Sequence, residues 1–295
     1  MLFHSYPLGL QFERPQPPEF FATDIGERRD VPLDGATLTL NTQTRVSVSQ
    51  TAGRLCLHVY YGELLINIEH RPGRRVEIFT DAARITDIGT KFDLRVSERA
   101  MTVTVVDGSL ELSTLSGSSR YTSTQASLIL KGGQRAEILN DRPNLHSVAP
   151  APTMSRGTVP STQPVTKPAD AGGIDVTSSQ PTAGRPDMEP LDISSPQLIT
   201  ETVNMADIDA SLAWQRDELY FRSAPIAKIV SEFNRYNRRP QIVIDDATLA
   251  ATKMSGAYDV HHPEVFLKDL RSMNPRVAVI RHAPPDETVE LALRR

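Results

Sequence analysis

The sequence contains a single cysteine, Cys56, among its 295 residues. One thiol allows neither an intramolecular disulfide nor a cysteine-based zinc site, so we expect Cys56 to be a small core residue. Long apolar runs are also missing, because a charged residue, Thr or Gly interrupts each of them. A spanning helix needs roughly 18 consecutive apolar residues. The sequence as given therefore predicts no transmembrane helix.

Neither sign of charge dominates the chain. Its 32 Lys and Arg residues stand against 36 Asp and Glu residues, which leaves a net charge of −4. Such a balance provides no long-range attraction for nucleic acid or acidic lipid. We therefore expect no nucleic-acid partner.

The motifs that anchor catalysis are missing too: a P-loop, a dinucleotide glycine fingerprint, His-Glu-x-x-His and a nucleophile elbow. His261 and His262 are adjacent and are expected in a loop before Pro263, where they would not readily chelate one metal. We thus predict a chain that is not an enzyme, with no catalytic residues, cofactor, metal or small-molecule substrate. An alternative stays open: a β-rich envelope protein, or a carbohydrate-active enzyme that uses two of the scattered carboxylates.

Residues 24–140 read as a β-rich domain, because short alternating apolar runs are separated by Gly-containing turns. Residues 101–113 alternate on both sides of Asp107 and Gly108, which predicts a two-stranded hairpin. Residues 55–61 and 64–68 predict two further strands that flank Gly62 and Glu63. A sandwich or a solenoid-like stack would bury such faces.

Two segments have the composition of disordered chain. Residues 141–206 are rich in Pro, Ser, Thr, Ala and Gly and contain no aromatic residue. They cannot bury enough apolar area to offset the entropy of ordering, so we expect a disordered linker. Residues 1–23 include several prolines and lack the pattern of a signal peptide, and we expect a poorly ordered N-terminal segment.

Residues 207–295 predict a small α/β domain of the order β-α-β, β-α-β. Apolar residues recur with a helical period from about residue 223 to the residue before Pro240, and again over 263–273. Strands are expected at 219–221, 241–244, 254–258, 277–280 and 289–293.

The candidate partner-binding residues all lie in this last domain. Arg and Tyr are enriched among residues that dominate interface energy, although cations at the end of a helix also stabilise its dipole. Phe221 is expected either in the core or at an exposed strand edge. The candidates are Phe221, Arg235, Tyr236, Arg238 and Arg239.

Several short motifs, taken in order, resemble the FecR family of anti-sigma regulators. Residues 26–41 resemble the pattern G-E-x-R-x-V-x-L-x-D-G-S-x-V-x-L-N, with one residue missing before Asp34. Similar motifs follow at residues 61–68, 88–94, 103–112 and 130–134. Near the C-terminus, residues 212–219 resemble A-W-R-x-G-x-L, and residues 233–237 read F-N-R-Y-N as in the family.

The resemblance implies a FecR domain followed by a domain like the short N-terminal domain of secretins and TonB-dependent receptors. It implies a periplasmic protein in cell-surface signalling and iron-uptake regulation, whose partner is the signalling domain of a TonB-dependent outer-membrane receptor. Relatives are anchored in the inner membrane by one helix that follows a cytoplasmic, sigma-binding segment. This chain as given lacks both, so an extracytoplasmic-function sigma factor is an expected partner only if such a segment exists.

Overall fold

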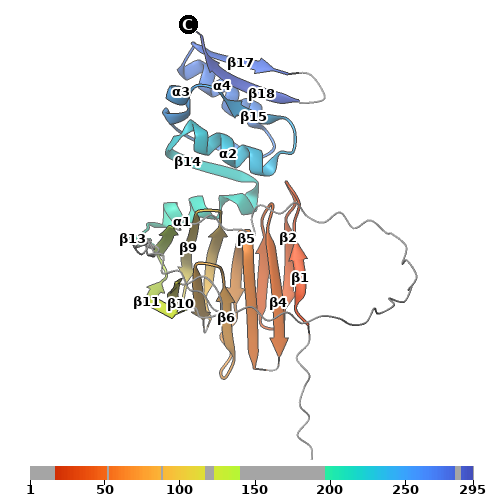
Figure 1. Ribbon diagram of the computed structural model, residues 1–295, viewed down its shortest axis with the longest axis vertical. Helices are drawn as coiled ribbons and strands as arrows, with labels where there is room; N and C mark the ends of the chain where they lie inside the picture. The colour runs from red at the N-terminus through yellow and green to blue at the C-terminus, as the bar shows by residue number, and fades with distance from the viewer. Residues whose placement is uncertain are drawn as a thin grey trace, which may run out of the picture. The chain divides into compact units, whose positions relative to one another are not determined.

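The computed structural model describes residues 17–51, 53–87, 89–116, 123–139, 197–282 and 287–294. The described residues before and after the gap at 140–196 belong to one compact unit. Figure 1 traces the chain through strands β1–β13, here called the β lobe, and then through the helices and strands of the C-terminal lobe. The expected combination of a β-rich part and a small α/β part is confirmed.

The β lobe contains two sheets that share one strand. Sheet A has the order β1-β4-β5-β6-β7-β10-β11, and sheet B has the order β2-β3-β5-β8-β9-β12-β13. The strands are β1 (Glu19–Ala22), β2 (Arg29–Leu33), β3 (Ala36–Leu40), β4 (Arg45–Thr51), β5 (Arg54–Ile68), β6 (Arg75–Phe79), β7 (Ala83–Asp87), β8 (Lys91–Val96), β9 (Ala100–Asp107), β10 (Ser109–Ser116), β11 (Ser123–Lys131), β12 (Gln134–Leu139) and β13 (Gln197–Thr202).

Strand β5 is continuous through a position where the sequence predicts a break. Its first half pairs with β4 and β6 in sheet A, and its second half pairs with β3 and β8 in sheet B. Gly62 lies at the crossing with φ +103, and a Cβ there would meet Thr44 Cα at 2.4 Å. Only glycine fits such a close approach. Gly62 therefore redirects the strand from one sheet to the other instead of ending it.

The two sheets enclose one hydrophobic core. Alternate residues of each strand point inward, for example Leu57 and Ile78 from sheet A and Ile66 and Leu94 from sheet B, all with 0% exposure. The β lobe is thus a curled, two-layered structure in which the consecutive hairpins β6–β7, β8–β9 and β10–β11 alternate between the two sheets.

The predicted hairpin at residues 101–113 is wrong. The turn at Gly108 is present, but β9 pairs with β8 and β12 in sheet B, whereas β10 pairs with β7 and β11 in sheet A. The two strands face each other across the core. An alternating pattern shows that one face is buried, but it does not identify the neighbouring strands.

The C-terminal lobe matches the predicted element order closely. Helix α2 carries the predicted apolar stripe, which includes Ile226, Ile229 and Phe233, and both sheets of this lobe share its core. Strand β14 pairs with β16, and β15-β18-β17 form a second sheet. The elements are α1 (Met205–Ser211), a 3-10 turn η1 (Ala213–Arg216), β14 (Glu218–Pro225), α2 (Ile226–Tyr236), β15 (Gln241–Ile244), α3 (Ala247–Ala251), β16 (Lys253–Asp259), α4 (Pro263–Met273), β17 (Val277–Arg281) and β18 (Thr288–Leu293).

Three further expectations need correction. Residues 19–22, expected to be poorly ordered, form β1 and pair with β4. Residues 197–202, expected in the linker, form β13, because pairing with β12 satisfies their backbone groups. Cys56 is half-buried on the outward side of β5 rather than in the core. Residues 1–16 and 140–196 lie outside the described residues, and the proposed domain boundaries stay a prediction.

Candidate functional site

The end of helix α2 connects the C-terminal lobe with the β lobe. Within the F-N-R-Y-N motif, Phe233 is fully buried in the C-terminal core. Asn234 exchanges two hydrogen bonds with the backbone of Ile242 at 2.7 and 2.8 Å, and Asn237 donates to Val260 O at 2.7 Å. These three residues fix the helix within its own lobe.

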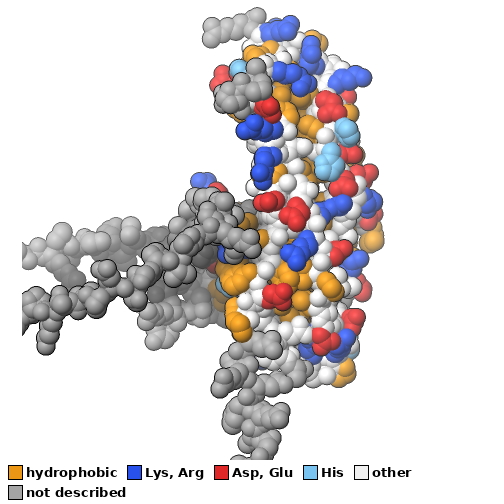
Figure 2. Space-filling view, turned by 90° about the vertical axis from the view of Figure 1, so that its right-hand side faces the viewer, with side chains coloured by type: hydrophobic (Ala, Val, Ile, Leu, Met, Phe, Trp, Pro, Cys, Tyr) orange, Lys and Arg blue, Asp and Glu red, His pale blue; other side chains and the backbone are white. Residues whose placement is uncertain are grey.

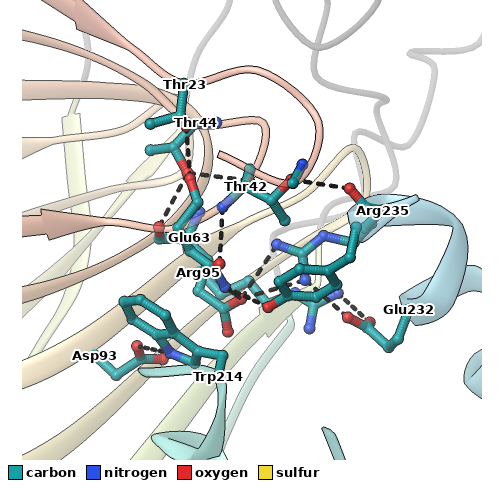
Figure 3. A network of polar contacts seen from close by, with 12 residues as sticks. Thr23, Thr42, Thr44, Glu63, Asp93, Arg95, Trp214, Glu232 and Arg235 are labelled. Atoms are coloured by element: carbon teal, nitrogen blue, oxygen red, sulfur yellow. Dashed lines mark hydrogen bonds and ion pairs between the residues drawn. The ribbon is translucent and has the colours of Figure 1, made fainter. Parts of the chain in front are cut away.

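The remaining two motif residues contact the β lobe. The Arg235 guanidinium lies 3.1 Å from the carboxylate of Glu63 on β5 and 2.7 Å from that of Glu232 on its own helix. Glu232 also forms an ion pair with Arg95 on β8. Figure 3 shows these side chains converging between the strands and the helix. The charges alternate in sign, in the order Glu63, Arg235, Glu232, Arg95, and we call these four residues the charge network.

Three of the four residues of the charge network are shielded from solvent, and the Arg95 side chain is 33% exposed. The side chains of Glu63 and Glu232 are each 8% exposed, and that of Arg235 is 17% exposed. Burial alone would raise the pKa of Glu232, but the charges of Arg95 and Arg235 outweigh it and hold this pKa at about 2. A buried carboxylate that loses its cation is strongly destabilising. The network therefore favours the arrangement in which α2 contacts the β lobe.

Further hydrogen bonds extend the contact around Tyr236. Asn41 Nδ2 donates to Tyr236 Oη at 2.6 Å and to Glu63 Oε2 at 2.8 Å. The Thr42 hydroxyl donates to Arg235 O at 2.9 Å and accepts a bond from Gly26 N at 2.8 Å. The end of α2 is thus held at both its side chains and its backbone.

Trp214 forms a second contact between the lobes. Its indole Nε1–H donates to Asp93 Oδ1 on β8 at 3.3 Å, and its ring is 3% exposed. Leu65, on the outward side of β5, packs in the same cluster as Trp214. Arg28 donates to Trp214 O at 2.8 Å and to Asp217 Oδ2 at 3.0 Å. The outer face of sheet B is therefore a binding surface for the C-terminal lobe.

Asp93 has an unfavourable environment for a charge. Burial raises the pKa of Asp93 well above its usual range, nearby Glu63 adds to the shift, and the hydrogen bond from Trp214 opposes it. Because this pKa is higher in the folded chain than in the unfolded one, ionisation of Asp93 costs stability as the pH rises through that interval. Asp93 and Glu232 therefore respond to pH in opposite directions.

A polar cleft of about 360 Å³ lies beside these contacts. Residues of both lobes line it, among them Glu63, Asp93, Arg135, Tyr220 and Lys228. Several of its charged residues are paired with each other, as Glu232 is with Arg95 and Asp207 with Arg222. In the described part of the chain, no three His, Cys, Asp or Glu side chains are grouped so as to hold a metal ion. The cleft is therefore part of the interface between the β lobe and the C-terminal lobe.

The predicted partner-binding residues have two different environments. Phe221 (5% exposed) lies in the C-terminal core, and Arg235 and Tyr236 are committed to the contacts with the β lobe. Arg238 and Arg239 remain exposed, at 70% and 58%, with carboxylates no nearer than 4.0 Å. Binding of a partner by these five residues stays a prediction.

Sequence reasoning missed the residues of the β lobe that complete the contact: Arg28, Asn41, Glu63, Asp93 and Arg95. The first four lie inside the motifs quoted for the resemblance, and Asp93 and Glu63 point outward from their strands yet are buried. A polar residue inside a motif, at a position that points away from the core of the β lobe, was the available signal for a second contact surface. Glu232, three residues before Arg235 on the buried side of α2, was another.

The architecture is thus a β sandwich that is joined to a small α/β lobe through buried polar contacts. Residues 20–111 match the model of the family described as FecR protein. The resemblance to the FecR family is therefore confirmed over residues 20–111, and the motifs at residues 130–134, 212–219 and 233–237 lie outside the matched segment.

Solved structures show the same fold over nearly the whole chain. Two crystal structures of a "putative anti-sigma factor" from Parabacteroides distasonis ATCC 8503 match with TM-scores of 0.63 and 0.62, each at 14% identity. The matches cover 95% and 94% of this chain and 100% of those chains. No match was found among the curated proteins. None of the described helices combines the length and the apolar character needed to cross a membrane.

Replacement of Arg235 tests the charge network. Arg235→Met leaves two buried carboxylates short of a cation, and we expect the free energy of unfolding to fall by about 3 kcal/mol or more. Urea titration followed by the fluorescence of Trp214, the single tryptophan, measures it at the contact itself. The matched control is Arg238→Met, which removes an exposed guanidinium and should change little. Equal losses for the two variants would contradict the network.

The pH dependence of Glu232 provides a second test. Its pKa falls from 4.5 to about 2 on folding, so its contribution is complete above pH 4.5 and is lost as the pH falls toward 2. We expect Glu232→Gln to lower the unfolding free energy at pH 7 by about 3 kcal/mol, with a smaller difference from wild type at pH 3.5. Glu98→Gln, at an exposed position, is the control. A difference that stays constant between the two pH values would refute this role.

Gly26 tests how closely the two lobes approach. It has φ +77, and a Cβ there would meet Tyr236 O at 2.8 Å, whereas Gly73 has φ +80 and nothing within 4 Å. Both alanine variants suffer the same backbone strain, so any additional loss in Gly26→Ala reports the contact with α2. We expect Gly26→Ala to shift Trp214 fluorescence toward that of an exposed indole and Gly73→Ala to leave it unchanged. Identical spectra would contradict the close approach.

Proposed function

We propose that this chain is the periplasmic, signal-receiving part of a FecR-type anti-sigma regulator and acts by binding proteins, without catalysis. The observation that carries the proposal is that family-like motifs from both ends of the chain meet in buried contacts between the lobes: Asn41, Glu63 and Asp93 on one side, Trp214 and Tyr236 on the other. The FecR match and the shared fold with an anti-sigma factor agree with it.

The partner we propose is the periplasmic signalling domain of a TonB-dependent outer-membrane receptor. Arg238 and Arg239 lie just after helix α2 and are exposed, so they can meet an acidic surface at the cost of only two long ion pairs, with Asp24 and Glu287, each at 4.0 Å. Figure 2 shows basic and acidic side chains interspersed over the viewed face, which favours local charge matching over attraction to one uniformly charged surface. An extracytoplasmic-function sigma factor is a second partner if a cytoplasmic segment exists.

The position of this basic pair gives a physical route from binding to regulation. Arg235 and Tyr236, which contact the β lobe, precede Arg238 by only two or three residues. A partner that binds Arg238 and Arg239 therefore contacts the chain at the end of α2. The charge network stabilises the end of α2 in one geometry only. Partner binding at Arg238 and Arg239 and the contact between the lobes therefore both depend on the backbone position of this segment.

The test uses the full chain and the isolated signalling domains of TonB-dependent receptors from the same organism. We expect saturable binding to one of them in calorimetry at moderate salt. Charge reversal in Arg238→Glu/Arg239→Glu should weaken it by about tenfold or more. The matched control is Arg271→Glu/Arg276→Glu, which reverses two exposed cations elsewhere in the same lobe.

Two results would count against the proposal. Absence of binding to every receptor domain, with the chain shown to be folded by its Trp214 fluorescence, would remove the receptor-reading role. Equal weakening by both double variants would mean that the affinity depends on total charge and not on the end of α2.

A further inference from the structure

Strand β16 has one unpaired edge. It pairs with β14 along Lys253–Asp259, and in the part of the chain that the structure describes no strand pairs with its other side. A row of free backbone N–H and C=O groups on such an edge is a template for another strand. The sheet formed by β14 and β16 has only two strands, and a sheet of this size gains stability from additional strands.

A groove follows this free edge. Consecutive residues 254–258 of β16 form one wall, and Asp269, Ser272 and Met273 of α4 form the other. Met273 is 62% exposed and adds an apolar side chain to this groove. A strand edge bordered by a helix is a recurring place for the addition of an extended segment.

The residue order of β16 is complementary to itself. In an antiparallel pair of β16 strands centred on Gly256, Lys253 of each strand lies opposite Asp259 of the other, and Ser255 lies opposite Ala257. All four of these side chains are on the exposed face, while Met254 and Tyr258 are buried on the opposite face. Opposite charges directly across an antiparallel pair are stabilising.

The local geometry supports both ends of this pairing. Asp259 Oδ1 accepts a hydrogen bond from His261 N at 2.7 Å, which holds the carboxylate at the end of the strand. No ion pair within the described residues involves Lys253. Lysine on an edge normally opposes pairing with a foreign strand, but here a second copy supplies the matching carboxylate.

We propose that β16 pairs with β16 of a second copy of this chain, antiparallel and around a twofold axis at Gly256, to give a four-stranded sheet of order β14-β16-β16-β14. A twofold interface uses the same patch on both copies, so the Lys253–Asp259 pair occurs twice. The exposed Met273 borders the same groove and gains cover from the second copy. The proposal goes beyond receptor binding and does not depend on it.

Sedimentation equilibrium of the full chain over a wide concentration range measures the association. We expect a reversible monomer–dimer equilibrium. Lys253→Glu should raise its dissociation constant by about tenfold or more, because each substitution acts at two places. Asp259→Lys should do the same. Lys131→Glu, an equal charge change on an exposed residue of β11, is the control.

Charge exchange separates pairing from misfolding. The double variant Lys253→Glu/Asp259→Lys should dimerise about as well as wild type, and an equimolar mixture of the two single variants should associate more tightly than either alone. Both combinations restore opposite charges at both ends of the pair. A chain that stays monomeric at every concentration, or a dimer that neither combination rescues, overturns the proposal.

Discussion

The placement of the Arg235 guanidinium between two buried carboxylates is the interaction on which the rest of the arrangement depends. Without it, Glu63 would be a buried charge on the outer face of a sandwich, and Glu232 a buried charge on an otherwise apolar helix side. Glu63 forms its ion pair with the other lobe, and Glu232 is paired with Arg95 of the β lobe as well as with Arg235 of its own helix. Charged groups of the two lobes thus compensate each other. If the lobes separated, the charged groups of the charge network would have to be hydrated or neutralised.

The second constraint is the shared strand β5. Because it belongs to both sheets, it carries residues that fill the core and also residues that receive the C-terminal lobe, next to Asp93 and Arg95 on β8. Ile66 points into the core, while its neighbours Leu65 and Glu63 point toward Trp214 and Arg235. A shift of the contact surface would therefore displace a strand that also fills the core.

Local patterns were sufficient for the C-terminal lobe but not for the β lobe. Helix α4 and strand β15 begin and end where periodicity and Pro263 or Pro240 predict, since helical stripes and proline stops are local signals. The division of strands between two sheets depends on pairings distant in sequence. The polar contact is more remote still: Asn41 and Tyr236 are 195 residues apart. Nothing within one motif identifies its counterpart, so the contact could not be predicted from the motifs.

The pairing of β12 with β13 has a consequence for the covalent chain. Leu139 and Gln197 lie opposite each other in this ladder, so the last described residue before the gap and the first one after it are neighbours. A proteolytic cut anywhere between them would remove no strand pair, ion pair or core contact described above. We expect the two fragments to copurify as one noncovalent complex. In this sense the polypeptide consists of two complementary fragments within one covalent chain.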